Sequence, residues 1–358
     1  MPTRTPLPIV QAPMAGAQDA RLAIAVCQAG GLGSIPAAML NSQTLRAQIA
    51  AIRAATDAPF NVNFFAHRPS VPDAAAEAAW RARLSVYYAE LGVEPVPAPP
   101  GPARAPFDEA ACALVEEMRP PIVSFHFGLP EAALVARVKA TGAHVWSSAT
   151  SVAEARWLEE RGVDAIIAQG VEAGGHRGMF LTDDPFAQVG LFALLPQIVD
   201  AVRTPIIAAG GVADGRGVAA AFALGARAAQ IGTAYLFTDE ATTGAPHRAA
   251  LRDARDDATR LTNLFTGRPA RALRNRLIRE QGPLSTHAPA FPHAVAALLP
   301  LRGAAERAGS DDFSPLWAGE AAALAQRRDS ATSDHSAGAL TRSLWRDAQS
   351  VARDLRLG

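Results

Sequence analysis

Residues 165–178 have the sequence Ala165-Ile166-Ile167-Ala168-Gln169-Gly170-Val171-Glu172-Ala173-Gly174-Gly175-His176-Arg177-Gly178. The first four residues form an apolar run of the length expected for a buried strand. The loop that follows is rich in glycine, which lets the backbone adopt positive φ and approach a ligand closely. It also carries His176, and histidine is the side chain best suited to exchange protons near neutral pH. A buried strand that ends in such a loop predicts part of an active site.

The same succession of an apolar run and a helical pattern recurs on both sides of this stretch. Short apolar runs predict strands at 9–14, 32–35, 59–65, 122–126, 144–147, 165–168, 205–209 and 228–231. Helical patterns are predicted at 20–29, 42–55, 74–91, 107–118, 131–140, 152–161, 191–202 and 215–224. Strict alternation favours a parallel sheet, and eight such units favour a closed (β/α)8 TIM barrel. An open doubly wound sheet would need glycines after its first strand, where Gln18-Asp19 stands instead.

The pattern changes outside the barrel units, which predicts a division of the chain. Residues 1–257 are expected to form the barrel, with an insertion at 66–120 whose proline-rich part, 93–106, is an exposed connector. Residues 258–328, which are rich in arginine and interrupted by prolines, predict a mostly helical lid. Residues 329–358 are expected to form a polar linker and a closing helix, 339–355, that packs back on the barrel.

Composition excludes several classes of function. Hydrophobic residues make up 49% of the chain and the formal net charge is zero, so no basic face for nucleic acid is indicated. Two cysteines without a CxxC spacing predict no metal centre. No apolar run is long enough to cross a membrane, and no leader pattern is seen. We therefore expect a cytoplasmic enzyme, a monomer or homodimer, that acts on a small molecule.

The active site of a TIM barrel lies at the C-terminal ends of its strands. The residues at these ends are polar or glycine: Met14, Asn63, His126, Gln169 with His176, Gly210-Gly211 and Gly232-Thr233. The loops after the seventh and eighth strands are the usual phosphate site of this fold. Here both contain glycine, whose backbone N–H groups can surround a phosphate; the alternative is that they are simply tight turns.

The other groups at these ends are mainly uncharged. The amides of Asn63 and Gln169 suit a neutral ring that alternates N–H and C=O, such as an isoalloxazine, although Asn63 could instead cap backbone. His126 has two open interpretations, a pocket wall or a core histidine with both nitrogens hydrogen-bonded. Glu172 and Arg177 are interpreted as a surface pair. No lysine or carboxylate cluster lies at these ends, so neither a Schiff base nor a metal is predicted.

Five segments together resemble the class I nitronate monooxygenases, formerly called 2-nitropropane dioxygenases. They are the Ala12-Pro13-Met14 turn, 60–65, 169–178, Ala209-Gly210-Gly211 and 224–233, and 124–128 and Leu316-Trp317-Ala318-Gly319 are also similar to family segments. The resemblance covers about residues 6–325. FMN-dependent enoyl-acyl-carrier-protein reductases have a similar histidine loop. This chain departs from some relatives near the substrate, because its C-terminal part has no lysine and its last tyrosine is Tyr235.

The resemblance implies a non-covalent FMN, with His176 over the ring as the catalytic residue. It assigns flavin and phosphate contacts to Met14, Asn63, Gln169, Gly174, Gly175, Gly210, Gly211, Gln230, Ile231, Gly232 and Thr233. His126 and Trp317 are the candidate substrate contacts, although Trp317 could simply anchor the lid. The implied reaction is oxidation of an alkyl nitronate, of the propionate 3-nitronate type, or of a nitroalkane, by O2. A carbonyl compound and nitrite would form without NAD(P)H, which is a detoxification reaction.

Two other functions stay open at this point. The first is an FMN-dependent enoyl-acyl-carrier-protein reductase, which would consume NAD(P)H. The second is a barrel that binds a flavin or phosphate without catalysis. A coloured protein with a flavin that is released on denaturation would argue against a barrel that binds another phosphate compound. Oxygen uptake with a nitronate would then distinguish a nitronate monooxygenase from an enoyl-acyl-carrier-protein reductase.

Overall fold

The computed structural model describes residues 4–95 and 104–355, so residues 96–103 of the predicted connector lie outside the described residues. It confirms the predicted TIM barrel. Eight parallel strands form one sheet in the order β1-β9-β8-β6-β5-β4-β3-β2. A single parallel bridge between Val10 and Leu32 joins the two ends of the sheet and nearly closes it. The strands are β1 (Ile9–Gln11), β2 (Ser34–Pro36), β3 (Asn61–Phe65), β4 (Ile122–His126), β5 (His144–Ala149), β6 (Ala165–Gln169), β8 (Ile206–Ala209) and β9 (Ala228–Ile231).

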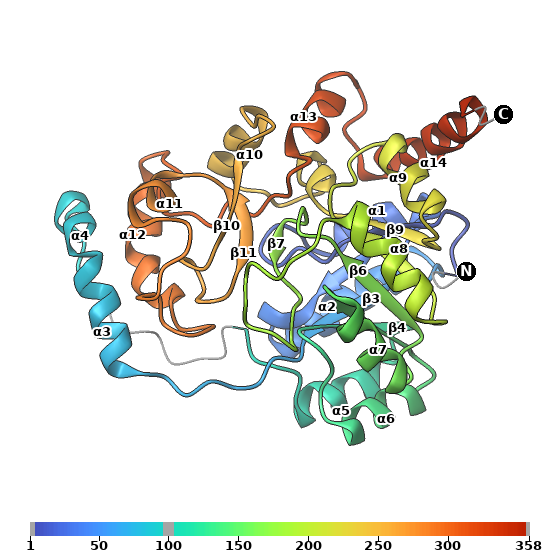
Figure 1. Cartoon of the computed structure of the whole chain (residues 1–358), viewed down its shortest axis with the longest axis horizontal. Coiled ribbons are helices and arrows are strands. Elements are labelled where there is room, and N and C mark those ends of the chain that lie inside the picture. Colours follow the sequence, from blue (N-terminus) through green and yellow to red (C-terminus); the bar gives the residue numbers. More distant parts are fainter. Residues whose placement is uncertain (1–3, 96–103, 356–358) are drawn as a thin grey trace.

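Helices cover the outside of this barrel (Figure 1). They are α1 (Ala20–Gln28), α2 (Ser42–Ala55), α5 (Glu109–Met118), α6 (Ala132–Ala140), α7 (Val152–Glu160), α8 (Leu191–Ala201), α9 (Gly215–Ala223) and α14 (Ala337–Asp354), with short 3-10 turns at Ala37–Met39 and Thr233–Phe237. The last helix, α14, packs against α9 and α1.

Side chains alternate between the two faces of each strand, and this alternation decides what lies inside the barrel. In β6, Ile166 and Ala168 join the apolar layer under the helices, whereas Ala165 and Ile167 join the cluster inside the barrel. Gln169 continues the inner series at the C-terminal end. Asn61 and Asn63 alternate in the same way with Val62 and Phe64, which belong to the outer layer. The amides in these apolar strands therefore face the interior.

A second body of the chain lies beside the barrel (Figure 1). It contains α3 (Ala74–Arg83), α4 (Ser85–Leu91), α11 (Arg276–Gln281) and α12 (Val295–Arg307). Two more helices, α10 (Ala245–Arg252) and α13 (Ala322–Ser330), pack with the barrel, because Leu251 and Ala322 belong to a buried cluster with Tyr235. The inserted helices α3 and α4 contribute Trp80, Tyr87 and Tyr88 to one buried cluster with Leu277 and Leu301. Part of the insertion thus packs with the C-terminal region.

This body also contains a small antiparallel sheet that the sequence did not predict. Strands β10 (Thr259–Thr262) and β11 (Ala270–Leu273) form a hairpin, and β11 pairs on its other edge with β7 (Gly175–His176). We call the three strands β10, β11 and β7 the lid sheet, and the glycine loop of the barrel therefore contributes one of its strands. The predicted helix 74–91 is divided at Leu84 into α3 and α4. In the described residues no helix has both the length and the hydropathy needed to cross a membrane.

Candidate active site

A polar layer covers the apolar interior of the barrel at the C-terminal ends of its strands. Asn63 Nδ2 donates to the Ser124 hydroxyl at 2.9 Å, and His126 Nδ1 lies 3.0 Å from the hydroxyl of Ser148. Gln169 is buried in the same layer. Each of these residues lies in the inward-facing series of its strand, at or near the C-terminal end, so the pleat explains why they meet.

Two of these side chains hold the main chain of His176. Gln169 Nε2 donates to the His176 carbonyl oxygen at 3.0 Å, and Gln169 Oε1 accepts from Gly178 N–H at 2.7 Å. His126 Nε2 lies 3.1 Å from the same carbonyl. A carbonyl only accepts, so His126 must be protonated at Nε2, and neutral His126 accepts from Ser148 at Nδ1. Both nitrogens of His126 thus have partners, as in the second interpretation of this residue.

Arg177 does not form the surface pair with Glu172 that the sequence suggested. Its side chain is completely buried, and its guanidinium donates to the carbonyls of Gly170 at 2.6 Å and Gln169 at 2.7 Å and to the Gln188 side chain at 2.8 Å. The Glu172 carboxylate instead accepts from Leu191 N–H at the start of α8. The fork of Arg177 holds the glycine loop in its folded form, because it binds two neighbouring carbonyls at once. The Gly170 carbonyl also accepts from Ala173 N–H at 3.1 Å.

The lid sheet fixes His176 from the other side. His176 pairs with Ala270 of β11, and its Nε2 lies 2.9 Å from Thr266 Oγ1 in the β10–β11 turn. The rings of Trp317 and Phe291 lie 5.3 and 5.5 Å from the imidazole between centroids. His176 is therefore held between barrel and lid, in an aromatic environment.

The environment keeps the imidazole neutral. Burial lowers the pKa of His176 well below 6.5, and the cations of Arg104 and Arg268 lower it further. Burial likewise lowers the pKa of His126 to about 4. Arg268 stacks on Phe127, with its guanidinium carbon 4.2 Å from the ring centroid. An uncharged His176 beside positive charges can accept a proton, and the same charges favour an anionic ligand.

We expect acid to destabilise the fold through His67. Burial and then the Arg268 cation lower the pKa of His67 from 6.5 to about 4. Between these values the unfolded chain binds a proton that the folded chain does not, so the free energy of unfolding decreases as the pH falls. The loss at this site reaches about 3 kcal/mol. Urea unfolding at neutral pH and at about pH 5 measures it; His67→Phe should lose part of the pH dependence, and an unchanged dependence would contradict this origin.

The candidate phosphate loops lie next to the histidine loop. Gly210 and Gly211 have φ of +110° and +70°, and a Cβ on Gly210 would be 3.1 Å from the carbonyl oxygen of Gly170. Gln230 of β9 has a buried side-chain oxygen without a hydrogen-bond partner in the described part of the chain. Ala12 N–H donates to the Ile231 carbonyl at 2.8 Å, which brings the Met14 turn to the end of β9.

The Trp317 segment closes this end of the barrel. A Cβ on Gly174 would lie 2.6 Å from backbone atoms of Ala318 and Gly319, so only glycine fits there. Gly319 N–H donates to Thr233 Oγ1 at 2.9 Å. The structure therefore brings together the predicted residues of the first, third, fourth, sixth, seventh and eighth strand ends and places Trp317 beside them.

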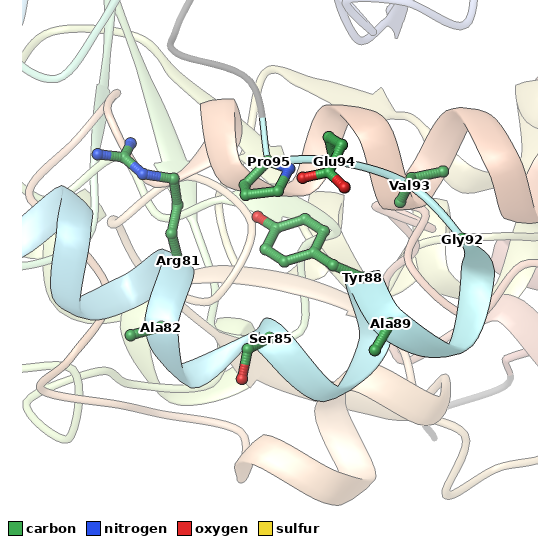
Figure 2. A pocket seen from close by; sticks show the side chains of 9 residues that line it. All are labelled: Arg81, Ala82, Ser85, Tyr88, Ala89, Gly92, Val93, Glu94 and Pro95. Atoms are coloured by element: carbon green, nitrogen blue, oxygen red, sulfur yellow. The ribbon is translucent and has the colours of Figure 1, made fainter.

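An open cavity of about 680 Å³ lies on α3 and α4 (Figure 2). Its lining residues are Arg81, Ala82, Ser85, Tyr88, Ala89, Gly92, Val93, Glu94 and Pro95. None of them comes from a strand end of the barrel. It is therefore separate from the site around His176.

Sequence reasoning missed several residues of this site, Phe291 and Ser124 among them. Thr266 and Arg268 belong to a turn whose contact with His176 depends on the unpredicted lid sheet. Ser148 continues the inward series of β5, so the alternation of that strand was a usable signal. Arg104 is buried near His176, but its place in a proline-rich connector gave no signal. Residues 4–95 and 104–355 contain no group of three or more side chains arranged for a metal ion.

The chain is similar over nearly its whole length to a known family. The family model described as nitronate monooxygenase matches residues 3–334. This chain belongs to the nitronate monooxygenase family. A nitronate monooxygenase of Paraburkholderia phytofirmans is 44% identical over 322 residues, which cover 89% of this chain and 88% of the relative. Members of the family are oxidoreductases and, in general, flavoproteins.

Two solved structures place the chain among its structural neighbours. A nitroalkane oxidase from Streptomyces ansochromogenes has a TM-score of 0.88 and 40% identity, with 98% of each chain covered. FabK from Thermotoga maritima has a TM-score of 0.74 and 28% identity, with 99% of this chain and 96% of that chain covered. Fold similarity thus extends to both, and sequence similarity is higher for the nitroalkane oxidase. This agrees with the family that the sequence motifs indicated.

Proposed function

We propose that this nitronate monooxygenase family member binds FMN at the C-terminal end of its barrel and uses O2 to oxidise alkyl nitronates, of the propionate 3-nitronate type, and nitroalkanes. The products are a carbonyl compound and nitrite, and no NAD(P)H is consumed. One observation carries the proposal: a neutral His176 is held by Gln169, His126 and Thr266 beside two glycine loops. A monomeric or homodimeric state and a cytoplasmic location are predictions from the sequence.

The residues at this end fit a flavin mononucleotide. The buried oxygen of Gln230 has no partner in the described residues, and a ring N–H would satisfy it. Gly210 and Gly211 have the positive φ values that let successive N–H groups turn toward a phosphate. The proposed contacts are Met14, Asn63, Gln169, Gly174, Gly175, Gly210, Gly211, Gln230, Ile231, Gly232 and Thr233. When bound, FMN supplies an electron acceptor that can pass electrons on to O2.

The chain's own groups prepare the substrate for this oxidation. Neutral His176 accepts the α-proton of a nitroalkane and leaves the anionic nitronate. A substrate that is already a nitronate needs no such step, and His176 then only positions it. Arg104 and Arg268 stabilise the anion electrostatically. Trp317 and Phe291 border the imidazole and reduce the access of water, and His126 acts through the His176 carbonyl.

We further propose that residues 1–257 form the FMN-binding part and 258–328 the lid, with 329–358 returning to the barrel. Helices α3 and α4 then complete the lid from the insertion 66–120, because they share its buried cluster. Residues of the lid, Thr266 and Trp317 among them, reach His176. In this arrangement the lid determines which substrates fit.

Gly210→Ala should weaken FMN binding. The φ of +110° at this position is accessible only to glycine, and the added Cβ would crowd Gly170 and Ala173 of the histidine loop. We expect the dissociation constant of FMN to rise by about tenfold or more. Fluorescence titration of the flavin-free protein measures it. Gly244→Ala is the control, because a Cβ there meets nothing within 4 Å; equal affinities for the two variants would argue against this phosphate site.

The visible absorption spectrum of the purified protein tests the cofactor, and an oxygen electrode tests the activity. We expect a flavin spectrum, release of FMN on denaturation, and oxygen uptake on addition of a small nitronate without nicotinamide. A colourless protein that does not take up FMN would refute the cofactor assignment. A flavoprotein that consumes no oxygen with any nitronate would refute the reaction.

A further inference from the structure

The hydroxyl of Thr266 is the only side-chain group in the described residues that hydrogen-bonds to the imidazole of His176. We propose that Thr266 fixes the tautomer of His176 with the proton on Nε2, so that Nδ1 is the atom that accepts the substrate proton. Thr266 is thus a positioning residue, which acts through His176. This inference deepens the proposed function and rests on it where turnover is concerned.

Two distances around Thr266 Oγ1 assign the protons. Oγ1 lies 2.9 Å from His176 Nε2 and 3.4 Å from the Arg268 carbonyl oxygen, to which it can donate. A hydroxyl has one proton. If it donates to the carbonyl, it accepts from Nε2–H and both hydrogen bonds form. If it donates to Nε2 instead, the contact with the carbonyl is lost. The first arrangement makes one more hydrogen bond and leaves the lone pair on Nδ1.

The turn that carries Thr266 is rigid, so the hydroxyl cannot easily move away. Gly267 has a φ of +87°, and a Cβ there would lie 2.0 Å from the Pro289 carbonyl oxygen, which means that the turn is packed tightly against the segment before Phe291. Arg177 N–H donates to the Pro269 carbonyl at 2.9 Å. The pairing of β7 with β11 and the bond from Arg177 N–H together fix the position of His176 relative to Thr266.

The surroundings of His176 agree with a base at Nδ1. The charged and titratable groups that act on it are Arg104 before α5, Arg268 in the β10–β11 turn, His126 on β4 and His67 after β3. All of them disfavour a charged imidazole, so the resting base is neutral. In the proton transfer the substrate C–H bond breaks and the Nδ1–H bond forms. The electron pair of the C–H bond stays on the substrate as the nitronate, and Nε2–H remains donated to Thr266.

Histidine-selective 15N NMR tests the tautomer without any turnover. Two-bond proton–nitrogen correlations distinguish a protonated from an unprotonated ring nitrogen, and His176→Gln identifies the signals. We expect His176 at neutral pH to show a protonated Nε2 and an unprotonated Nδ1, in the protein with its cofactor bound. A protonated Nδ1 would overturn the proposal. This readout is independent of the proposed function, which fails separately if the wild-type protein does not oxidise nitronates.

Two substitutions test the consequence for turnover. Thr266→Val removes the hydroxyl, and we expect kcat/KM for a neutral nitroalkane to fall roughly 10- to 100-fold, while that for the nitronate changes less than about twofold. The pH dependence of the nitroalkane reaction should also shift. Thr266→Ser, which keeps the hydroxyl, should restore both. Thr242→Val is the control, because Thr242 is exposed. Equal losses with both substrates, or no rescue by serine, would show a merely structural role and overturn the proposal.

Discussion

His176→Gln should lower kcat/KM for a neutral nitroalkane by roughly 10²- to 10⁴-fold, and the protein should remain yellow. The substitution removes the imidazole that the structure places between the barrel and the lid sheet. The backbone of residue 176 keeps its bonds from Gln169 and His126, so the loop should retain its conformation. FMN should stay bound because the glycine loops do not depend on the imidazole.

The substrate decides how large this effect is. A preformed nitronate has already lost its α-proton, so its oxidation should fall much less than that of the nitroalkane. Steady-state oxygen uptake with both substrates measures the ratio. His287→Gln is the matched control, because His287 is exposed on the lid. If the nitroalkane rate of His176→Gln equals that of the wild-type protein, His176 is not the base.

Arg177→Met should have the largest effect on stability. The side chain is completely buried and binds the carbonyls of Gln169 and Gly170 and the side chain of Gln188. Methionine removes all of these hydrogen bonds, and the Gly170 carbonyl keeps only its bond from Ala173 N–H; the loss costs roughly 3 kcal/mol or more. The free energy of unfolding from urea titrations measures this loss, and the flavin content should decrease with it because the loop touches the cofactor site.

Two further variants separate the hydrogen bonds from the charge. Arg177→Lys keeps the cation but not the fork, so it should recover only a part of the stability. Arg156→Met removes an arginine from the exposed face of α7 and should change the stability by less than about 0.5 kcal/mol. An Arg177→Met protein as stable as this control would show that the buried guanidinium does not hold the loop.

The barrel was predictable from the sequence because each of its strands is a short apolar run that can be recognised without knowledge of the rest of the fold. The apolar runs and the alternation of Asn61 and Asn63 with Val62 and Phe64 follow directly from the pleat. The C-terminal ends of those strands then gave most of the candidate site. Gln169 was predicted as a flavin contact, but its amide group already binds the main chain of His176 and Gly178, so any flavin contact comes in addition.

The lid sheet was not predictable in this way. The two-residue strand Gly175–His176 is too short to show an alternation of apolar and polar residues. Its partner β11 lies about 95 residues further along the chain. The role of Thr266 follows from that pairing alone. Arg177 gave a misleading signal, since arginines are mostly exposed. Its burial becomes understandable only when the folded loop shows which carbonyls its guanidinium binds.

Structural similarity leaves one alternative reaction to test, the reduction of an enoyl thioester. FabK from Thermotoga maritima has the same fold at 28% identity, and FMN-dependent enoyl-acyl-carrier-protein reductases have a similar histidine loop. The two reactions differ in what they consume. A nitronate monooxygenase takes O2 and a nitronate, whereas an enoyl reductase takes NAD(P)H and an enoyl thioester.

Oxygen consumption and nitrite release by the purified flavoprotein therefore test the central claim most directly. The protein is mixed with propionate 3-nitronate in air without nicotinamide, and in parallel with NADPH or NADH and an enoyl thioester. We predict rapid oxygen uptake and nitrite release in the first mixture and no thioester reduction in the second. Reduction of the enoyl thioester, with neither oxygen uptake nor nitrite from the nitronate, would contradict the proposed function.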